Sequence, residues 1–217
     1  MKIPSWVPVR FSKLTSCFLC EPDRRLVVDR RPPLFSMVGL GPITERYIMI
    51  ASVDHVRSFA DLHQLDRGIG PQVSALRREM QADAPPLLMT EHGRVPACVD
   101  DEDGHDAHCF HAHFLLFQSS GDISKHCQSY FLHSDSFSSL SDALEHAGQC
   151  ENYHLLSPSD NDYTVFSGAL NVPRQFFRKM VAYVEGDAGM ADWRDHPSYD
   201  KAKENAAFER KRQGIVS

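Results

Sequence analysis

Residues 104–117 read GHDAHCFHAHFLLF and place four histidines within nine residues. Alternation of two residue types with a period of two is typical of a half-buried strand. On such a strand Phe110 and Ala112 belong to an apolar face, and His111 and His113 point the other way. Two residues along a strand span roughly 6.6 Å, so both imidazoles can contact one phosphate group, or one can ligate a metal beside the other. The alternative is a pair of solvated histidines, but histidine is not a favoured strand residue, so packing explains the pair poorly.

The composition indicates a globular chain that does not bind a nucleic-acid polymer. With 42 % hydrophobic residues, its 217 residues can bury a real core. A formal net charge of −6 argues against a broad basic surface for a nucleic-acid polymer, although local basic groups could hold a single nucleotide. The sequence contains no apolar run of signal-peptide or membrane-spanning length. We therefore expect a cytoplasmic protein that does not bind a membrane.

Apolar runs and helical periodicities predict a mixed structure in the first half of the chain. Two runs suit an antiparallel pair of strands, at residues 35–42 and 47–51. Ser52 is a candidate cap for a helix from residue 54 to about 63, and a second helix begins at Pro71. A further strand opens at residues 87–89 and precedes an acidic loop that leads into the histidine strand.

The sequence pattern changes beyond Gln118. Three strands are predicted, at residues 129–133, 153–156 and 163–166, and three helices, at residues 139–147, 173–184 and 197–212. We place a domain boundary near residue 120. Residues 1–120 then form the first domain, and residues 121–217 form an α/β extension that packs on it.

Cys17-x-x-Cys20 is the second informative motif. Cysteines in a cytoplasmic chain should be mostly reduced, which favours a metal-binding pair or a redox pair over a disulfide framework. A structural zinc site needs four ligands, so the fold would have to supply two more, for which His55 and His111 are our choices. His108 competes as the fourth ligand, although on a regular strand it lies opposite His111. Two reduced, buried thiols are the alternative interpretation.

Three segments in this order resemble the histidine triad (HIT) superfamily of nucleotide hydrolases and nucleotidyl transferases. They are Cys17-x-x-Cys20, residues 41–55 (GPITERYIMIASVDH) and residues 111–114 (HAHF), so the resemblance covers about the first 120 residues. Residues 91–93 (EHG), 172–178 (VPRQFFR) and 192–194 (DWR) resemble a branch of HIT-like proteins that carry a C-terminal extension.

The resemblance implies a fold, an assembly and a metal. The implied fold is α+β, a HIT-like antiparallel sheet with packed helices. Members are usually homodimers in which the two sheets become continuous, so we expect a homodimer. In the members that contain zinc, the ligands match Cys17, Cys20, His55 and His111, which makes a structural zinc ion the expected cofactor.

The resemblance also implies a catalytic mechanism at His111 and His113. His113 matches the nucleophile, which attacks the α-phosphorus of a nucleotide or nucleotide conjugate and expels the leaving group. The nucleotidyl-imidazole that results is then resolved by water or by another acceptor. Such chemistry needs a neutral imidazole in the correct tautomer and donors aimed at the phosphate oxygens.

Several positions depart from the family pattern. Leu115 replaces the third signature histidine and cannot donate a hydrogen bond. Tyr47 stands where many members have histidine, and Gly39 lies near the place of a ribose-binding acidic residue. The candidate substitutes for the missing polar groups are His108, His92, Gln118, Gln175, Arg178 and Arg194. The alternative function is therefore a catalytically impaired HIT-like nucleotide-binding or scaffold protein that keeps zinc and the dimer.

Overall fold

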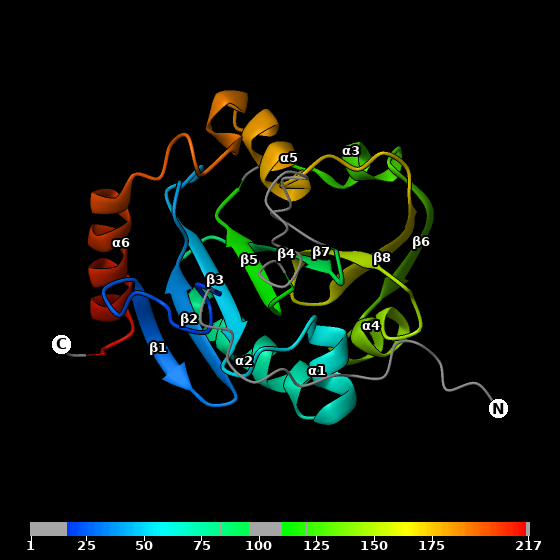
Figure 1. The fold of residues 1–217 in the computed structure, drawn as a ribbon, viewed down its shortest axis with the longest axis horizontal. Coiled ribbons are helices and arrows are strands. Elements are labelled where there is room, and N and C mark those ends of the chain that lie inside the picture. The colour runs from blue at the N-terminus through cyan, green and yellow to red at the C-terminus, as the bar shows by residue number, and fades with distance from the viewer. Residues whose placement is uncertain (1–16, 83, 96–109, 120, 216–217) are drawn as a thin grey trace.

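The computed structural model describes residues 17–82, 84–95, 110–119 and 121–215 (Figure 1). Its centre is an eight-stranded sheet with the order β1-β2-β3-β5-β4-β7-β8-β6, in which every neighbouring pair is antiparallel. The strands are β1 Val27–Arg31, β2 Leu34–Val38, β3 Tyr47–Ser52, β4 Leu88–Gly93, β5 His113–Phe117, β6 Phe131–Phe137, β7 Tyr153–Ser159 and β8 Asp162–Ala169. The predicted α+β class with an antiparallel sheet is confirmed.

Helices cover both faces of the sheet. One face packs on α1 (Phe59–Leu65), α2 (Ile69–Gln81) and α4 (Leu140–Ala147), and the other on α5 (Phe176–Val184) and α6 (Tyr199–Arg212). Two short helices complete the described elements, α3 (Ser124–Gln128) and a 3₁₀ turn, η1 (Ala188–Ala191). No described helix combines the length and apolar composition needed to cross a bilayer.

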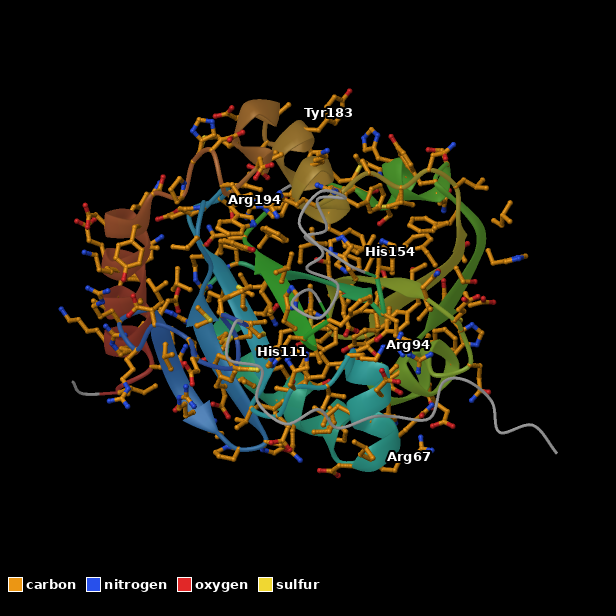
Figure 2. All side chains as sticks on the ribbon, in the orientation of Figure 1. Arg67, Arg94, His111, His154, Tyr183 and Arg194 are labelled. Carbon is orange, nitrogen blue, oxygen red and sulfur yellow. The ribbon has the colours of Figure 1, made fainter. Side chains whose placement is uncertain are left out.

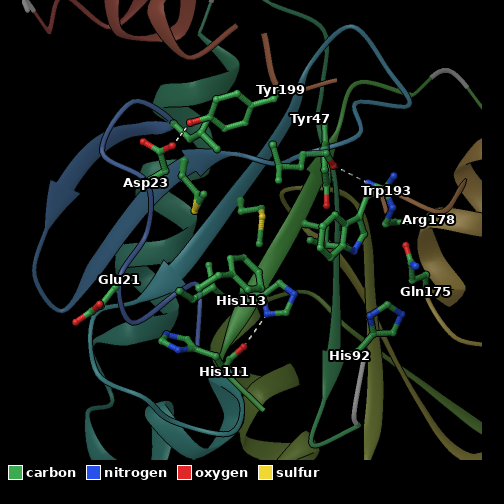
Figure 3. A pocket seen from close by; sticks show the side chains of 17 residues that line it. Glu21, Asp23, Tyr47, His92, His111, His113, Gln175, Arg178, Trp193 and Tyr199 are labelled. Atoms are coloured by element: carbon green, nitrogen blue, oxygen red, sulfur yellow. Dashed lines mark hydrogen bonds between the residues drawn. The ribbon is translucent and has the colours of Figure 1, made fainter. Parts of the chain in front are cut away.

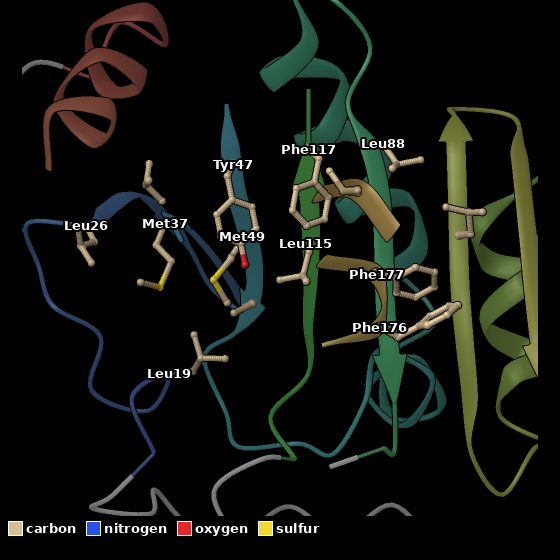
Figure 4. Close-up of a cluster of buried hydrophobic side chains, with 14 of the residues drawn as sticks. Leu19, Leu26, Met37, Tyr47, Met49, Leu88, Leu115, Phe117, Phe176 and Phe177 are labelled. Atoms are coloured by element: carbon tan, nitrogen blue, oxygen red, sulfur yellow. The ribbon is translucent and has the colours of Figure 1, made fainter. Parts of the chain in front are cut away.

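The histidine strand alternates as the sequence predicts. Phe114 and Leu116 belong to the core beneath α1 and α2, whereas Leu115 and Phe117 belong to the core on the opposite face. Figure 4 shows this second core, where α5 contributes aromatic side chains. Figure 2 shows how side chains fill the space on both sides of the sheet, with Tyr183 of α5 projecting outward. His113, two residues before Leu115, therefore faces the side of the sheet that α5 covers.

Some predicted boundaries are wrong. The first helix begins at Phe59, because Ser58 is its cap and accepts a hydrogen bond from the Asp61 amide at 3.1 Å. Ser52, the predicted cap, instead donates to the Asp54 carbonyl at 2.7 Å. Strand β1 is missing from the prediction, because its charged and half-exposed residues lack an apolar alternation.

The sheet repeats one arrangement on both sides of its centre. In the first half β3 is followed by helices and by β4 and β5, with the order β3-β5-β4. In the second half β6 is followed by α4 and by β7 and β8, with the order β6-β8-β7. The two units meet where β4 pairs with β7, as an approximate two-fold axis between these strands would require. Strands from both sides of residue 120 therefore belong to one sheet.

Candidate functional site

Four predicted metal ligands come together beside the histidine strand. Cys17 and Cys20 lie in one turn, His55 follows β3, and His111 precedes β5. All four side chains are buried, and their ligand atoms lie within 4.8 Å of one another. This cluster could hold a metal ion. The competing ligand His108 lies outside the described residues.

The distances within the cluster fit a tetrahedral ion. His111 Nδ1 lies 3.4 Å from Cys17 Sγ and 3.7 Å from Cys20 Sγ, and His55 Nδ1 lies 3.2 Å from Cys20 Sγ. With Zn–S of about 2.3 Å and Zn–N of about 2.0 Å, a tetrahedron places donor atoms about 3.3 to 3.8 Å apart. The His111 Nε2–H donates to the Ser52 carbonyl at 2.8 Å, which leaves the Nδ1 lone pair facing the sulfurs. The donors are therefore arranged for a cation.

Burial sets the protonation of these ligands before a cation binds. Burial raises the pKa of the Cys17 thiol to about 11. The neighbouring Cys20 thiol contributes to this increase. Burial lowers the pKa of His111 to about 4, so that this imidazole is neutral at neutral pH. A metal ion would displace thiol protons, which makes its affinity dependent on pH.

His113 lies at the first position of β5 and is oriented by the main chain. Its Nδ1–H donates to the His111 carbonyl at 2.6 Å (Figure 3). A carbonyl only accepts, so in the neutral ring Nδ1 carries the proton and Nε2 keeps its lone pair. Burial lowers the pKa of His113, which favours the neutral ring despite the opposing effect of the hydrogen bond. The geometry thus gives a half-buried neutral imidazole whose Nε2 lone pair is not engaged by the His111 carbonyl.

A cavity of about 390 Å³ adjoins His113. Its walls are mostly apolar and come from the N-terminal turn, from the sheet and from the segments around α5 and α6. The apolar and aromatic lining residues are Phe18, Leu19, Leu26, Met37, Leu40, Tyr47, Met49, Leu115, Trp193 and Tyr199. The polar and charged lining residues are Glu21, Asp23, His92, His111, His113, Gln175 and Arg178.

Arg178 lines the cavity, but its guanidinium binds the main chain. Nε donates to the Ala191 carbonyl at 2.8 Å, and Nη2 donates to the Gly41 carbonyl at 2.8 Å. The guanidinium carbon also lies 5.0 Å above the centre of the Tyr47 ring. Arg178 therefore ties α5 to the turn between β2 and β3, and its predicted contact with substrate stays a prediction.

Three of the remaining predicted residues divide between two cavities, whereas the Arg194 guanidinium lies over the Trp193 ring. His92 and Gln175 line the His113 cavity, as the sequence hypothesis requires. Gln118 does not, because it follows the far end of β5 and lines a second cavity beside α6. Leu115, 5 % exposed, also lines the first cavity and places an apolar group beside His113.

Sequence reasoning missed residues that close the cavity from distant segments. Trp193 follows η1, and Tyr199 begins α6 and donates to the Asp23 carboxylate. Hydrogen bonds from Arg25, and secondarily from Tyr199, hold the pKa of Asp23 well below its usual range, so this carboxylate is charged. Only the segment containing Trp193 carried a signal, through the resemblance of residues 192–194.

Comparison with known proteins adds no assignment. No protein-family model matches the chain, and no curated protein matches it. The geometry of the candidate metal cluster, His113 and the cavity is therefore the basis for a function.

Proposed function

We propose that this protein is a nucleotide-processing enzyme, a hydrolase or nucleotidyl transferase that cleaves a nucleoside 5′-phosphoryl bond through His113. One observation carries the proposal: the His113 Nδ1–H donates to the His111 carbonyl, which leaves Nε2 as a base and nucleophile beside the cavity. Fixing one ring nitrogen is how proteins prepare the other for covalent catalysis.

The proposed reaction has two steps, transfer of the nucleotidyl group to His113 and its transfer to an acceptor. The His113 Nε2 lone pair forms a bond to the α-phosphorus as the bond to the leaving group breaks, and the leaving group departs with that electron pair. The imidazole then carries the nucleotidyl group and keeps its Nδ1–H on the His111 carbonyl. Water or another acceptor attacks the phosphorus, the P–N bond breaks, and its electron pair returns to Nε2 while the acceptor loses a proton to solvent.

The cavity supports a substrate with a large apolar or aromatic part. Trp193, Phe18 and the methionine side chains of Met37 and Met49 provide surfaces against which a nucleobase can pack. The charged groups do not favour a long polyphosphate, because Arg178 is engaged by carbonyls while Glu21 and Asp23 are acidic.

We also propose zinc as the metal and membership of the HIT superfamily. Two thiols and two imidazoles, all buried, form a ligand set that suits zinc in a structural role. When bound, such an ion supplies a cross-link between the N-terminal turn and the segment before β5. His111 would then serve twice, through Nδ1 as a ligand and through its carbonyl as the group that orients His113.

A catalytically impaired nucleotide-binding or scaffold protein is the second candidate. Leu115 favours it, since this side chain faces the cavity without any donor for a phosphate. Loss of one transition-state donor typically costs about 10² to 10³ in rate, which slows a reaction without abolishing it. Binding of nucleotides that persist unchanged would support this candidate.

Intact-protein mass spectrometry tests the proposal. Wild type, His113→Ala and the control His133→Ala, an exposed residue of β6, are incubated briefly with nucleoside phosphoramidates, dinucleoside polyphosphates and nucleotide sugars. We expect a mass gain of one nucleotidyl group in wild type and in the control, and none in His113→Ala. Turnover that persists fully in His113→Ala would contradict the proposal.

The homodimer and the cytoplasmic location stay predictions. In the described sheet the outer strands are β1 and β6, so a continuous sheet between two chains would have to use one of these edges. Light scattering tests the dimer: twice the chain mass of 24.5 kDa supports it, and the single mass contradicts it.

A further inference from the structure

Three histidines form a row across the middle of the sheet. His92 of β4 pairs directly with His154 of β7. Thr90 pairs with Leu115, so the same antiparallel register, continued by two residues, places His92 opposite His113. His92 and His113 line the same cavity, and Figure 3 shows their rings beside one another below Gln175. His92 is thus the polar side chain nearest in register to the nucleophile.

The main chain fixes the tautomer of His92. The Phe177 amide donates to His92 Nε2 at 3.4 Å. An amide N–H only donates, so Nε2 is unprotonated, and the neutral ring carries its proton on Nδ1. Among the described residues none accepts a hydrogen bond from Nδ1, and Nδ1 is not a buried orphan atom. Its N–H is therefore available to a ligand in the cavity.

Aromatic rings hold His92 in place. The His154 ring packs edge-on against it at 5.1 Å, and the Phe177 ring lies 5.0 Å away. His154 is fully buried among phenylalanines, and neither of its ring nitrogens has a hydrogen-bond partner in the part of the chain that the structure describes. Burial lowers the pKa of His92 well below its usual value, so the ring that is held there is neutral.

We propose that the His92 Nδ1–H donates a hydrogen bond to the phosphoryl group that His113 attacks. This inference rests on the proposed function. No proton is transferred: the N–H stays intact and stabilises the negative charge that builds on a phosphoryl oxygen. His92 would thereby supply, from the neighbouring strand, the donor that Leu115 cannot supply on β5.

Two amide substitutions distinguish the role of the His92 Nδ1 from that of its Nε2. In His92→Asn the side-chain amide lies near the position of Nδ1, and in His92→Gln it lies near the position of Nε2. The substrate is the nitrophenyl ester of a nucleoside 5′-monophosphate, and kcat and KM are measured for wild type, both variants and His113→Ala. Thermal unfolding of each variant is recorded in parallel.

We expect His92→Asn to keep kcat within about tenfold of wild type and His92→Gln to lose about 10² to 10³, with little change in KM. The opposite ranking would assign His92 the structural role of accepting from Phe177 and would overturn the inference. Equal kcat values in the two variants, high or low, would overturn it as well. If His113→Ala retains the wild-type rate, the proposed function itself fails, whatever the two His92 variants do.

Discussion

His111 and His113 are joined by a hydrogen bond of 2.6 Å from the His113 imidazole to the His111 carbonyl, while the His111 imidazole faces Cys17 Sγ at 3.4 Å. The same residue therefore belongs to the candidate metal cluster and orients the candidate nucleophile. A change in the cluster can reach His113 through His111 alone, because the candidate ligand and the hydrogen-bond acceptor are the side chain and the carbonyl of this one residue.

Metal content should depend on the four clustered residues. We expect about one zinc per chain in wild type and little in Cys20→Ser, while Cys150→Ser, which changes a half-buried cysteine outside the cluster, keeps the ion. A free metal concentration of 100 times Kd stabilises the fold by about 2.7 kcal/mol, so a chelator should lower the unfolding temperature of wild type. Elemental mass spectrometry and calorimetry measure both effects. An equal metal content in the two variants would rule out this ligand set.

Gly41→Ala should destabilise the cavity wall. Gly41 has φ of +64°, and a Cβ there would lie 2.7 Å from the Trp193 Cβ and 2.8 Å from its Cα. The positive φ costs about 1–2 kcal/mol, and crowding adds about 1–3 kcal/mol. Gly186→Ala is the matched control, since Gly186 has φ of +81° and an added Cβ there would meet no atom of the described residues within 4 Å. Urea unfolding compares them, and equal losses would show that Trp193 does not press on this turn.

Glu91 should make stability fall as pH rises. Its carboxyl is buried, with hydrogen bonds from the Phe59 amide at 2.7 Å and the Tyr153 hydroxyl at 2.6 Å. Burial raises its pKa from 4.5 to about 8 despite these bonds. Between these values the folded state holds a proton that the unfolded state has lost, so this group lowers the free energy of unfolding by up to about 1.4 kcal/mol per pH unit.

Glu91→Gln should remove this slope, because the amide does not ionise. Unfolding free energies of wild type and Glu91→Gln, measured from pH 4.5 to 8, should diverge in favour of the variant as pH rises. Glu145→Gln, an exposed change on α4, should run parallel to wild type. Parallel curves for Glu91→Gln would mean that the carboxyl is already ionised in the folded state.

Arg178→Lys should affect stability more than substrate binding. The guanidinium donates to carbonyls on both sides of the cavity wall, at Gly41 and at Ala191, and a lysine cannot bridge them. Hydrogen bonds to charged groups contribute about 1.5–3 kcal/mol each, so we expect a loss of a few kcal/mol in urea unfolding. Lys179→Arg, an exposed neighbour on α5, should be neutral. A raised KM with unchanged stability would restore the predicted contact with substrate.

Local sequence patterns alone predict some features of this chain correctly. Alternation places Phe114 and Leu116 on one face and Leu115 on the other, because a strand has a period of two whatever it pairs with. The spacing Cys17-x-x-Cys20 likewise holds both thiols within one turn, in which the Cys20 amide donates to the Cys17 carbonyl at 3.0 Å. Both features depend on neighbours a few residues away.

Contacts between distant polar groups follow from the strand order and not from local sequence patterns. His111 lies 94 residues from Cys17 in sequence, and its contact exists because β5 pairs with β3 beside the N-terminal turn. Strand order likewise brings His92 into line with His113, and it places Gln118 in another cavity, although Gln118 is the closer of the two to His113 in sequence. Periodicity gives the face of a side chain, whereas its partners depend on the order and register of strands, which long-range packing sets.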